Sequence, residues 1–186
     1  WGPHEWESLA RRAQQQGYLC LAMRMRGHDA VSREGRGYRQ FKREDWLDVL
    51  KDIAGAARVL REKGADPQNL VVGGASLGAN LALHYAVRNE AVLAVILLSP
   101  GLEYQGIETE TAIEELGRRP VLLMFTKGDA YSASSCRRLK ARASGLCELR
   151  EYEGASHGTD ILNSSASSIG QILLWLKDIV GTQPAA

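Results

Sequence analysis

A serine lies between glycines in residues 73–78 (GGASLG), after an apolar run typical of a strand and before a run typical of a helix. A Gly-x-Ser-x-Gly pattern at such a junction can expose the serine hydroxyl as a nucleophile. Glycines at both flanks free the backbone for a tight turn, and the N–H of Leu77 at the helix N-terminus can stabilise an oxyanion. A serine that only caps the helix gives the same pattern, so the motif alone leaves both interpretations of Ser76 open.

A serine is a weak nucleophile near pH 7 and needs a base that is itself oriented by a third group. The chain has four histidines. His84 lies two turns along the helix that begins at Ser76, roughly 12 Å away along its axis, and cannot meet the hydroxyl. His4 and His28 precede the serine, where chain order argues against them. His157 follows the last predicted strand, at the sheet edge where open α/β sheets bind ligands, and is the best candidate base.

Two acids compete to orient His157. Asp129 follows the predicted strand 121–125, and Glu103 stands in the same relation to the strand that ends at Leu98. Ser76, Asp129 and His157 occur in the order Ser, Asp, His, each at the C-terminal end of a strand. The spacing therefore predicts Ser76 as nucleophile, His157 as base, Asp129 as acid and the Leu77 N–H as oxyanion donor, with Glu103 as the alternative acid.

Helices alternate with short apolar strands along the chain. This order predicts one α/β domain over residues 1–186, with a doubly wound, mainly parallel sheet and helices on both faces. We expect helices over residues 9–16, 44–63, 77–87, 132–143 and 167–180, and strands over 18–25, 70–72, 92–98, 121–125 and 148–152.

Composition narrows the class of protein. Lys and Arg number 23 against 22 Asp and Glu, so the charge gives no signal for binding to nucleic acid or to an anionic membrane. No apolar stretch reaches the roughly 18 residues needed to cross a bilayer. The three cysteines have neither disulfide-framework nor metal-site spacing, which favours a reducing, cytoplasmic location.

These motifs resemble the α/β-hydrolase superfamily over nearly the whole chain. Residues 74–78 are similar to its nucleophile elbow, 128–129 to its acid turn, 156–158 to its histidine loop and 26–28 to its Arg-Gly-His turn. Residues 99–102 (SPGL) resemble small bacterial carboxylesterases and dienelactone hydrolases, although the latter usually carry a cysteine nucleophile. The resemblance implies a serine hydrolase that cleaves small carboxylic esters through an acyl-serine, with no cofactor and no metal. Peptide or lactone cleavage on the same triad, and a binding module without catalysis, stay open.

The family's central strand, whose His-Gly turn supplies a second oxyanion N–H, has no counterpart in this sequence. In the family that strand lies between those that match residues 18–25 and 70–72, so the resemblance implies an N-terminally truncated sequence. We expect either a gap in the sheet or two flanking strands that have closed up. An open gap would expose a strand edge, which favours pairing between copies and hence a homo-oligomer.

Overall fold

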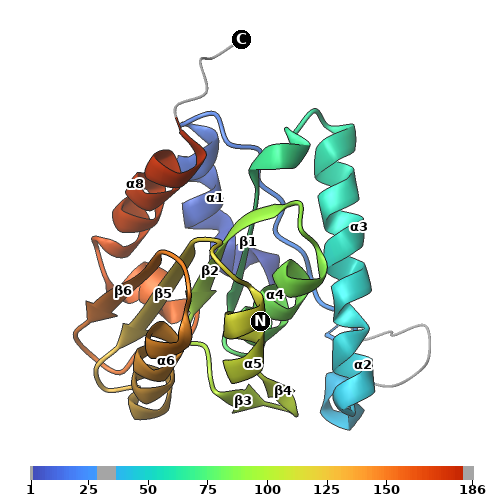
Figure 1. Cartoon of the computed structure of the whole chain (residues 1–186). Coiled ribbons are helices and arrows are strands. Elements are labelled where there is room, and N and C mark those ends of the chain that lie inside the picture. Colours follow the sequence, from blue (N-terminus) through green and yellow to red (C-terminus); the bar gives the residue numbers. More distant parts are fainter. Residues whose placement is uncertain (1, 29–36, 182–186) are drawn as a thin grey trace.

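A computed structural model of the chain describes residues 2–28 and 37–181. Parallel strands form its main sheet in the order β1-β2-β5-β6, with helices on both faces (Figure 1). This arrangement confirms the predicted α/β fold class. The strands of this sheet are β1 (Leu70–Ala75), β2 (Val92–Leu98), β5 (Val121–Thr126) and β6 (Cys147–Tyr152).

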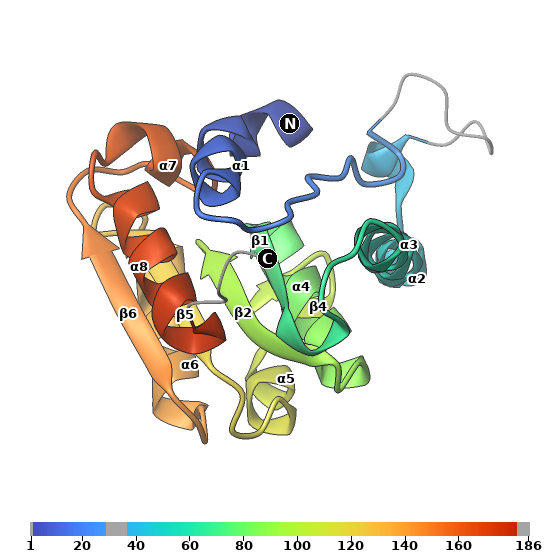
Figure 2. The same ribbon diagram turned by 90° about the horizontal axis from the view of Figure 1, so that it is seen from above.

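The helices lie in two layers against the sheet. Helices α1 and α8 cover one face, α4, α5 and α6 cover the other, and α3 lies beside α4 (Figure 2). Among the described residues, no helix is both long and apolar enough to span a bilayer. The helices are α1 (Glu7–Gln14), α2 (Arg43–Leu47), α3 (Val49–Glu62), α4 (Leu77–Arg88), α5 (Glu110–Glu115), α6 (Ala130–Arg142), α7 (Asp160–Ser164) and α8 (Ser168–Val180); a hairpin of β3 (Glu103–Tyr104) and β4 (Ile107–Glu108) follows β2, and 3₁₀ turns span Pro3–Trp6, Tyr38–Gln40 and Pro67–Asn69.

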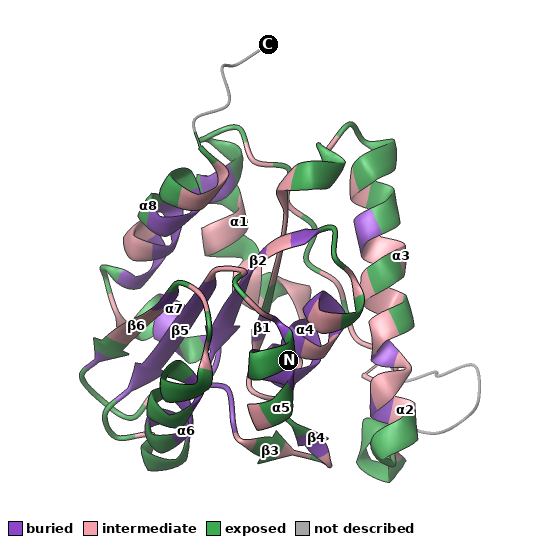
Figure 3. Cartoon of the chain, viewed as in Figure 1, coloured by how far each residue is buried: buried purple, intermediate pink, exposed green. Residues whose placement is uncertain are grey.

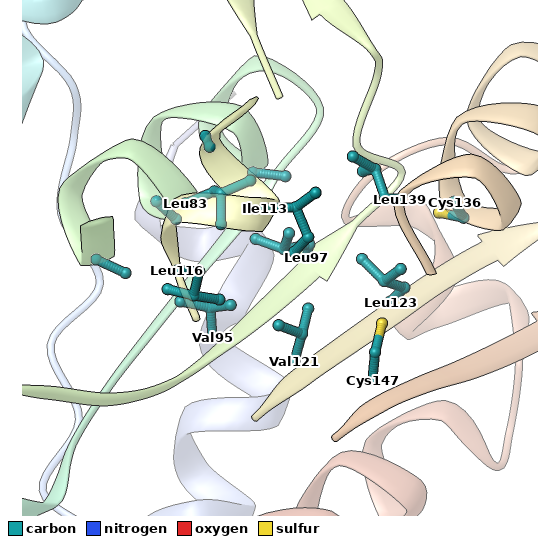
Figure 4. Close-up of a cluster of buried hydrophobic side chains, with 14 of the residues drawn as sticks. Leu83, Val95, Leu97, Ile113, Leu116, Val121, Leu123, Cys136, Leu139 and Cys147 are labelled. Atoms are coloured by element: carbon teal, nitrogen blue, oxygen red, sulfur yellow. The ribbon is translucent and has the colours of Figure 1, made fainter. Parts of the chain in front are cut away.

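Strands β2 and β5 are buried on both faces, which explains their nearly continuous apolar sequences (Figure 3). Successive side chains of a strand point to opposite faces. Val95, Leu97 and Leu123 accordingly pack with α4, α5 and α6 (Figure 4), whereas Ile96 and Leu122 pack on the side of α1 and α8. The strand ends that carry the candidate site are thus fixed from both sides.

The predicted strand over residues 18–25 is wrong. The backbone there is extended without a strand ladder, and Leu19 and Leu21 are 51% and 38% exposed. A strand needs a neighbour for its N–H and C=O groups, and β1 pairs only with β2 in the described sheet. The segment is held at its end instead, where the Arg26 guanidinium donates to both carboxylate oxygens of Asp52 in α3, at 2.8 and 2.5 Å.

A slot of about 440 Å³ separates residues 18–25 from β1. The two flanking segments have therefore not closed up, and the expected gap is present as a slot beside β1, at the edge of the described sheet. The slot extends to the candidate site, because Ser76 and His157 also line it. Its other walls are mainly apolar and include Leu21, Met23, Ile53, Leu60, Val71 and Ile96.

Candidate active site

Ser76 occupies a strained turn between β1 and α4. Its φ is 54° and its ψ is −127°, a conformation that non-glycine residues rarely adopt. The Ser76 N–H donates to the carbonyl of Leu98 in β2 at 2.8 Å, and its own carbonyl accepts the N–H of Ala79 at 2.9 Å. A capping serine has an extended backbone and bonds to the first turn, but the Ser76 side chain makes no such bond. The turn presents the hydroxyl outward and does not use it as a helix cap.

Gly74 makes this turn sterically possible. A Cβ at position 74 would lie 2.0 Å from the carbonyl oxygen of Gly78, which is far inside van der Waals contact. The expectation that both flanks need glycine is wrong for Gly78, since a Cβ there would have only the Cε of Met25 within reach, at 4.0 Å. Of the two flanking glycines, only Gly74 is therefore required on steric grounds.

Gly74→Ala is expected to destabilise the fold by more than the about 1–3 kcal/mol typical of an overpacked core, because the clashing atom is a backbone oxygen that cannot rotate away. Gly73→Ala is the matched control, since its Cβ would lie 3.5 Å from the nearest atom, the carbonyl oxygen of Ile96. Urea unfolding of both variants measures the difference. Equal stability of the two variants would contradict this account of the turn.

The structure brings Ser76, His157 and Asp129 together from loops at the ends of β1, β6 and β5. His157 Nε2 lies 2.8 Å from Ser76 Oγ, and His157 Nδ1 lies 2.6 Å from Asp129 Oδ2. The Asp129 side chain is 13% exposed and that of His157 is 39% exposed. The imidazole thus joins a mostly buried carboxylate to a serine hydroxyl while its own face remains open to a ligand.

The Asp129 carboxylate is held in its charged form. Burial raises the pKa of this group, but hydrogen bonds from His157 and Ser132 outweigh burial, and the net pKa is lowered. The backbone N–H of Ser132 donates to Asp129 Oδ1 at 3.3 Å, so Asp129 also caps helix α6. Its two oxygens are therefore fixed by different partners, one by the imidazole and one by the helix.

Two polar residues at strand ends anchor the loop that carries His157. Ser99 Oγ accepts the N–H of Gly158 at 2.9 Å, and Thr126 Oγ1 donates to the carbonyl of Ser156 at 2.7 Å. Both anchors are fully buried. The sequence interpretation missed them, although a Ser and a Thr directly at the ends of buried apolar strands were a usable signal.

The other residues considered from sequence lie elsewhere. Glu103 accepts a hydrogen bond from the N–H of Gly106 in its own hairpin, while both ring nitrogens of His157 are engaged by Asp129 and Ser76. His84 Nε2 lies 2.6 Å from the carbonyl oxygen of Glu108, and His28 stacks on Tyr38. Within residues 2–28 and 37–181, no group of three His, Cys, Asp or Glu side chains is placed to hold a metal ion.

Comparison with known proteins identifies the fold. A search of curated proteins finds no match. Among solved structures, the chain is similar to a monoacylglycerol lipase from Paleococcus ferrophilus, with 16% identity, 98% of this chain and 91% of that chain covered and a TM-score of 0.69. It is similar to the esterase domain of a Rhodothermus marinus protein (17% identity, 95% and 80% covered, TM-score 0.71) and to a carboxylesterase from Bacillus cereus (18%, 96% and 84%, TM-score 0.68).

At these identities the structural likeness shows the fold alone. The sequence itself gives the family, because a family model described as alpha/beta hydrolase fold matches residues 40–135, more than half of the chain. The matched region contains the turn at Ser76 and extends through Asp129. The chain belongs to the α/β-hydrolase family.

Proposed function

We propose that the chain is a single-domain serine hydrolase that cleaves small carboxylic esters through an acyl-serine intermediate. The observation that carries the proposal is the contact of 2.8 Å between Ser76 Oγ and His157 Nε2, at a strained turn and with Asp129 on the other ring nitrogen. Nucleophile, base and orienting acid are the three groups that such a mechanism requires.

In this mechanism Ser76 Oγ attacks the ester carbonyl as His157 Nε2 takes its proton. Asp129 holds the imidazole in the tautomer that leaves Nε2 free to accept, and its charge stabilises the imidazolium. Leu77 is the first residue of α4, so its N–H has no partner within the helix, and in this mechanism it donates to the oxyanion. His157 then gives the proton to the departing alcohol, and water releases the acyl group by the same steps in reverse order.

The proposed substrate class, carboxylic esters, is supported by the family and by the kinds of enzyme among the similar solved structures. The similar structures named above are a lipase and two esterases, which supports esters over other acyl compounds. The same three side chains also perform peptide or lactone cleavage elsewhere, so these reactions are the alternatives within catalysis. The hydrolysis of a small-molecule ester by these three side chains needs no cofactor. We also propose that the protein is located in the cytoplasm, where the free thiols of Cys20, Cys136 and Cys147 would stay reduced.

Labelling with a fluorophosphonate tests the proposed function directly. The reagent should add to the wild-type chain once, and mass spectrometry of the digested protein should place the adduct on Ser76. Ser164→Ala, which alters an exposed serine in α7, is the control and should label like wild type. A folded chain that takes no label, or takes it at another serine, would overturn the proposal.

A second candidate function is a binding module that keeps the fold without hydrolysis. The slot beside β1 favours this candidate, because β1 has a strand partner on one side only in the described sheet and the slot is mainly apolar. Such an edge can pair with a strand of another copy or of another protein. A folded, unlabelled chain that sediments as a dimer would support this candidate, and a labelled monomer would exclude it.

A further inference from the structure

Tyr104 lies over the candidate site, although no step of the proposed reaction uses it. It belongs to the β3–β4 hairpin that follows β2 (Figure 1). The Tyr104 ring meets the imidazole of His157 edge-on, with ring centroids 6.3 Å apart and planes 86° apart. An aromatic side chain is therefore part of the wall around the reacting groups.

The position of Tyr104 is built by its neighbours. The Tyr131 hydroxyl donates to the carbonyl of Glu103 at 2.9 Å and accepts the N–H of Glu103 at 3.0 Å, which fixes the backbone directly before Tyr104. The two tyrosine rings meet edge to face at 5.6 Å. Gly101 leaves room for both rings, because a Cβ there would lie 2.6 Å from Tyr104 and 2.7 Å from Tyr131.

The Tyr104 hydroxyl belongs to the polar surroundings of the candidate site. It lies 3.4 Å from Ser132 Oγ, and hydrogen bonding with Ser132 and Ser76 lowers the pKa of its phenol against the effect of burial. The N–H of Ser132 donates to Asp129, which contacts His157, which contacts Ser76. The hydroxyl of Tyr104 thus lies beside the polar groups that hold the orienting acid, and its ring lies against the base.

The phenol of Tyr104 keeps its proton at neutral pH. Burial is the main cause that raises the pKa of this group; the charges of Asp129 and Tyr131 raise it further, and hydrogen bonds with Ser132 and Ser76 oppose the shift without cancelling it. A neutral phenol can donate a hydrogen bond. The Tyr104 hydroxyl is therefore available as a donor in the wall of the site.

The geometry of acyl transfer limits which oxygen this donor can serve. The carbonyl oxygen must lie at the Leu77 N–H, whereas the leaving-group oxygen must lie beside His157 Nε2, which gives it a proton. The Tyr104 ring contacts the ring of His157, the group that protonates the leaving oxygen, and Ser76 is among the groups that act on the pKa of its phenol. A donor against this ring is on hand for the oxygen that leaves.

We propose that Tyr104 is a further catalytic residue, whose hydroxyl donates a hydrogen bond to the leaving-group oxygen as the ester C–O bond breaks. The inference rests on the proposed function. The electron pair of the broken bond stays on the departing oxygen, which receives from His157 the proton taken from Ser76. Tyr104 keeps its own proton throughout.

Tyr104→Phe tests this role, because it removes the hydroxyl and keeps the ring. We expect kcat/KM to fall about 10- to 100-fold for phenyl and ethyl acetate, and about threefold or less for p-nitrophenyl acetate. The p-nitrophenolate ion leaves readily without a donor, whereas the poorer leaving groups need one. The deacylation rate of the shared acetyl-enzyme should change little for any of the three esters, because the leaving group has gone.

Tyr85→Phe is the matched control, since it removes a phenol that accepts from Asn89 Nδ2 at 2.8 Å near the far end of α4, and it should not change the dependence on the leaving group. An equal loss by Tyr104→Phe on all three esters would reduce Tyr104 to a wall or positioning residue and overturn the inference, as would no loss at all. A wild-type chain that neither labels nor hydrolyses would overturn the proposed function and this inference together.

A titration that needs no turnover tests the contact itself. In protein labelled with ¹³C at the tyrosine ring, Ser76→Ala should raise the pKa of Tyr104, because it removes one of the hydrogen bonds that lower it. An unchanged Tyr104 titration would show that its hydroxyl does not reach the nucleophile, and would sink the inference even where Tyr104→Phe fails to fold.

Discussion

Ser76→Ala is expected to lower kcat for p-nitrophenyl acetate by about 10⁶-fold, to the rate left by the oxyanion donor and by binding alone. The hydroxyl at position 76 is the oxygen within reach of His157 Nε2, at 2.8 Å, so no other group of the site can take over the attack. The variant should also lose the fluorophosphonate adduct completely.

The substitution leaves the fold intact, which makes the kinetic result interpretable. Alanine at φ 54° has the same backbone strain as serine, and the two backbone hydrogen bonds of the turn do not involve the side chain. Urea unfolding should therefore give a free energy of unfolding within about 1 kcal/mol of wild type. A rate within tenfold of wild type, in a folded variant, would assign the nucleophile to another residue.

The central strands are the part of the fold that the sequence predicts best. Strand β2 is observed at the residues expected for it, Val92–Leu98, because a nearly continuous apolar run fits a strand that is buried on both faces. The same pattern led to a wrong prediction over residues 18–25. An apolar run shows that a segment could form a strand, but it does not show whether a neighbouring strand is there to pair with it. In the part of the chain that the structure describes, no strand pairs with that segment.

The missed β3–β4 hairpin depends on contacts that no local sequence pattern records. The β3–β4 hairpin has strands of two residues each, too short for any periodicity. It is held by Arg43, whose Nε donates to the carbonyl of Gly106 at 2.9 Å, and by Thr109, whose hydroxyl donates to the carbonyl of Gly101 at 2.7 Å. Tyr104 reaches the candidate site only through this hairpin, so nothing local in the sequence indicates it.

The positions of the three candidate residues were predictable because parallel strands deliver their following loops to one edge of the sheet. The sequence predicted Asp129 as the acid and left Glu103 as the alternative, because both follow buried strands. The structure separates them, since Asp129 Oδ2 lies 2.6 Å from His157 Nδ1 whereas the Glu103 carboxylate accepts the N–H of Gly106. Substituting each acid in turn can therefore test which of them orients His157.

Asp129→Asn is expected to lower kcat/KM by about 10⁴-fold. An amide cannot stabilise the imidazolium, and its N–H favours the imidazole tautomer that has its proton on the wrong nitrogen. Asparagine caps helices as well as aspartate does, so α6 should keep its N-terminus and the loss should be catalytic. Because the pKa of Asp129 lies below its ordinary value, its carboxylate is ionised in the wild type at the neutral pH of the assay, and the substitution removes a full negative charge from the imidazole.

Glu103→Gln makes the same chemical change on the rival acid and is the matched control. It weakens one hydrogen bond to the N–H of Gly106 in an exposed turn, so kcat/KM should stay within about threefold of wild type. The ratio of the two decreases in kcat/KM decides which residue is the acid. Both variants remove one negative charge near the same edge of the sheet, but only Asp129 contacts His157. A larger loss in Glu103→Gln than in Asp129→Asn would give the role of the acid to Glu103 and would require the hairpin to move when substrate binds.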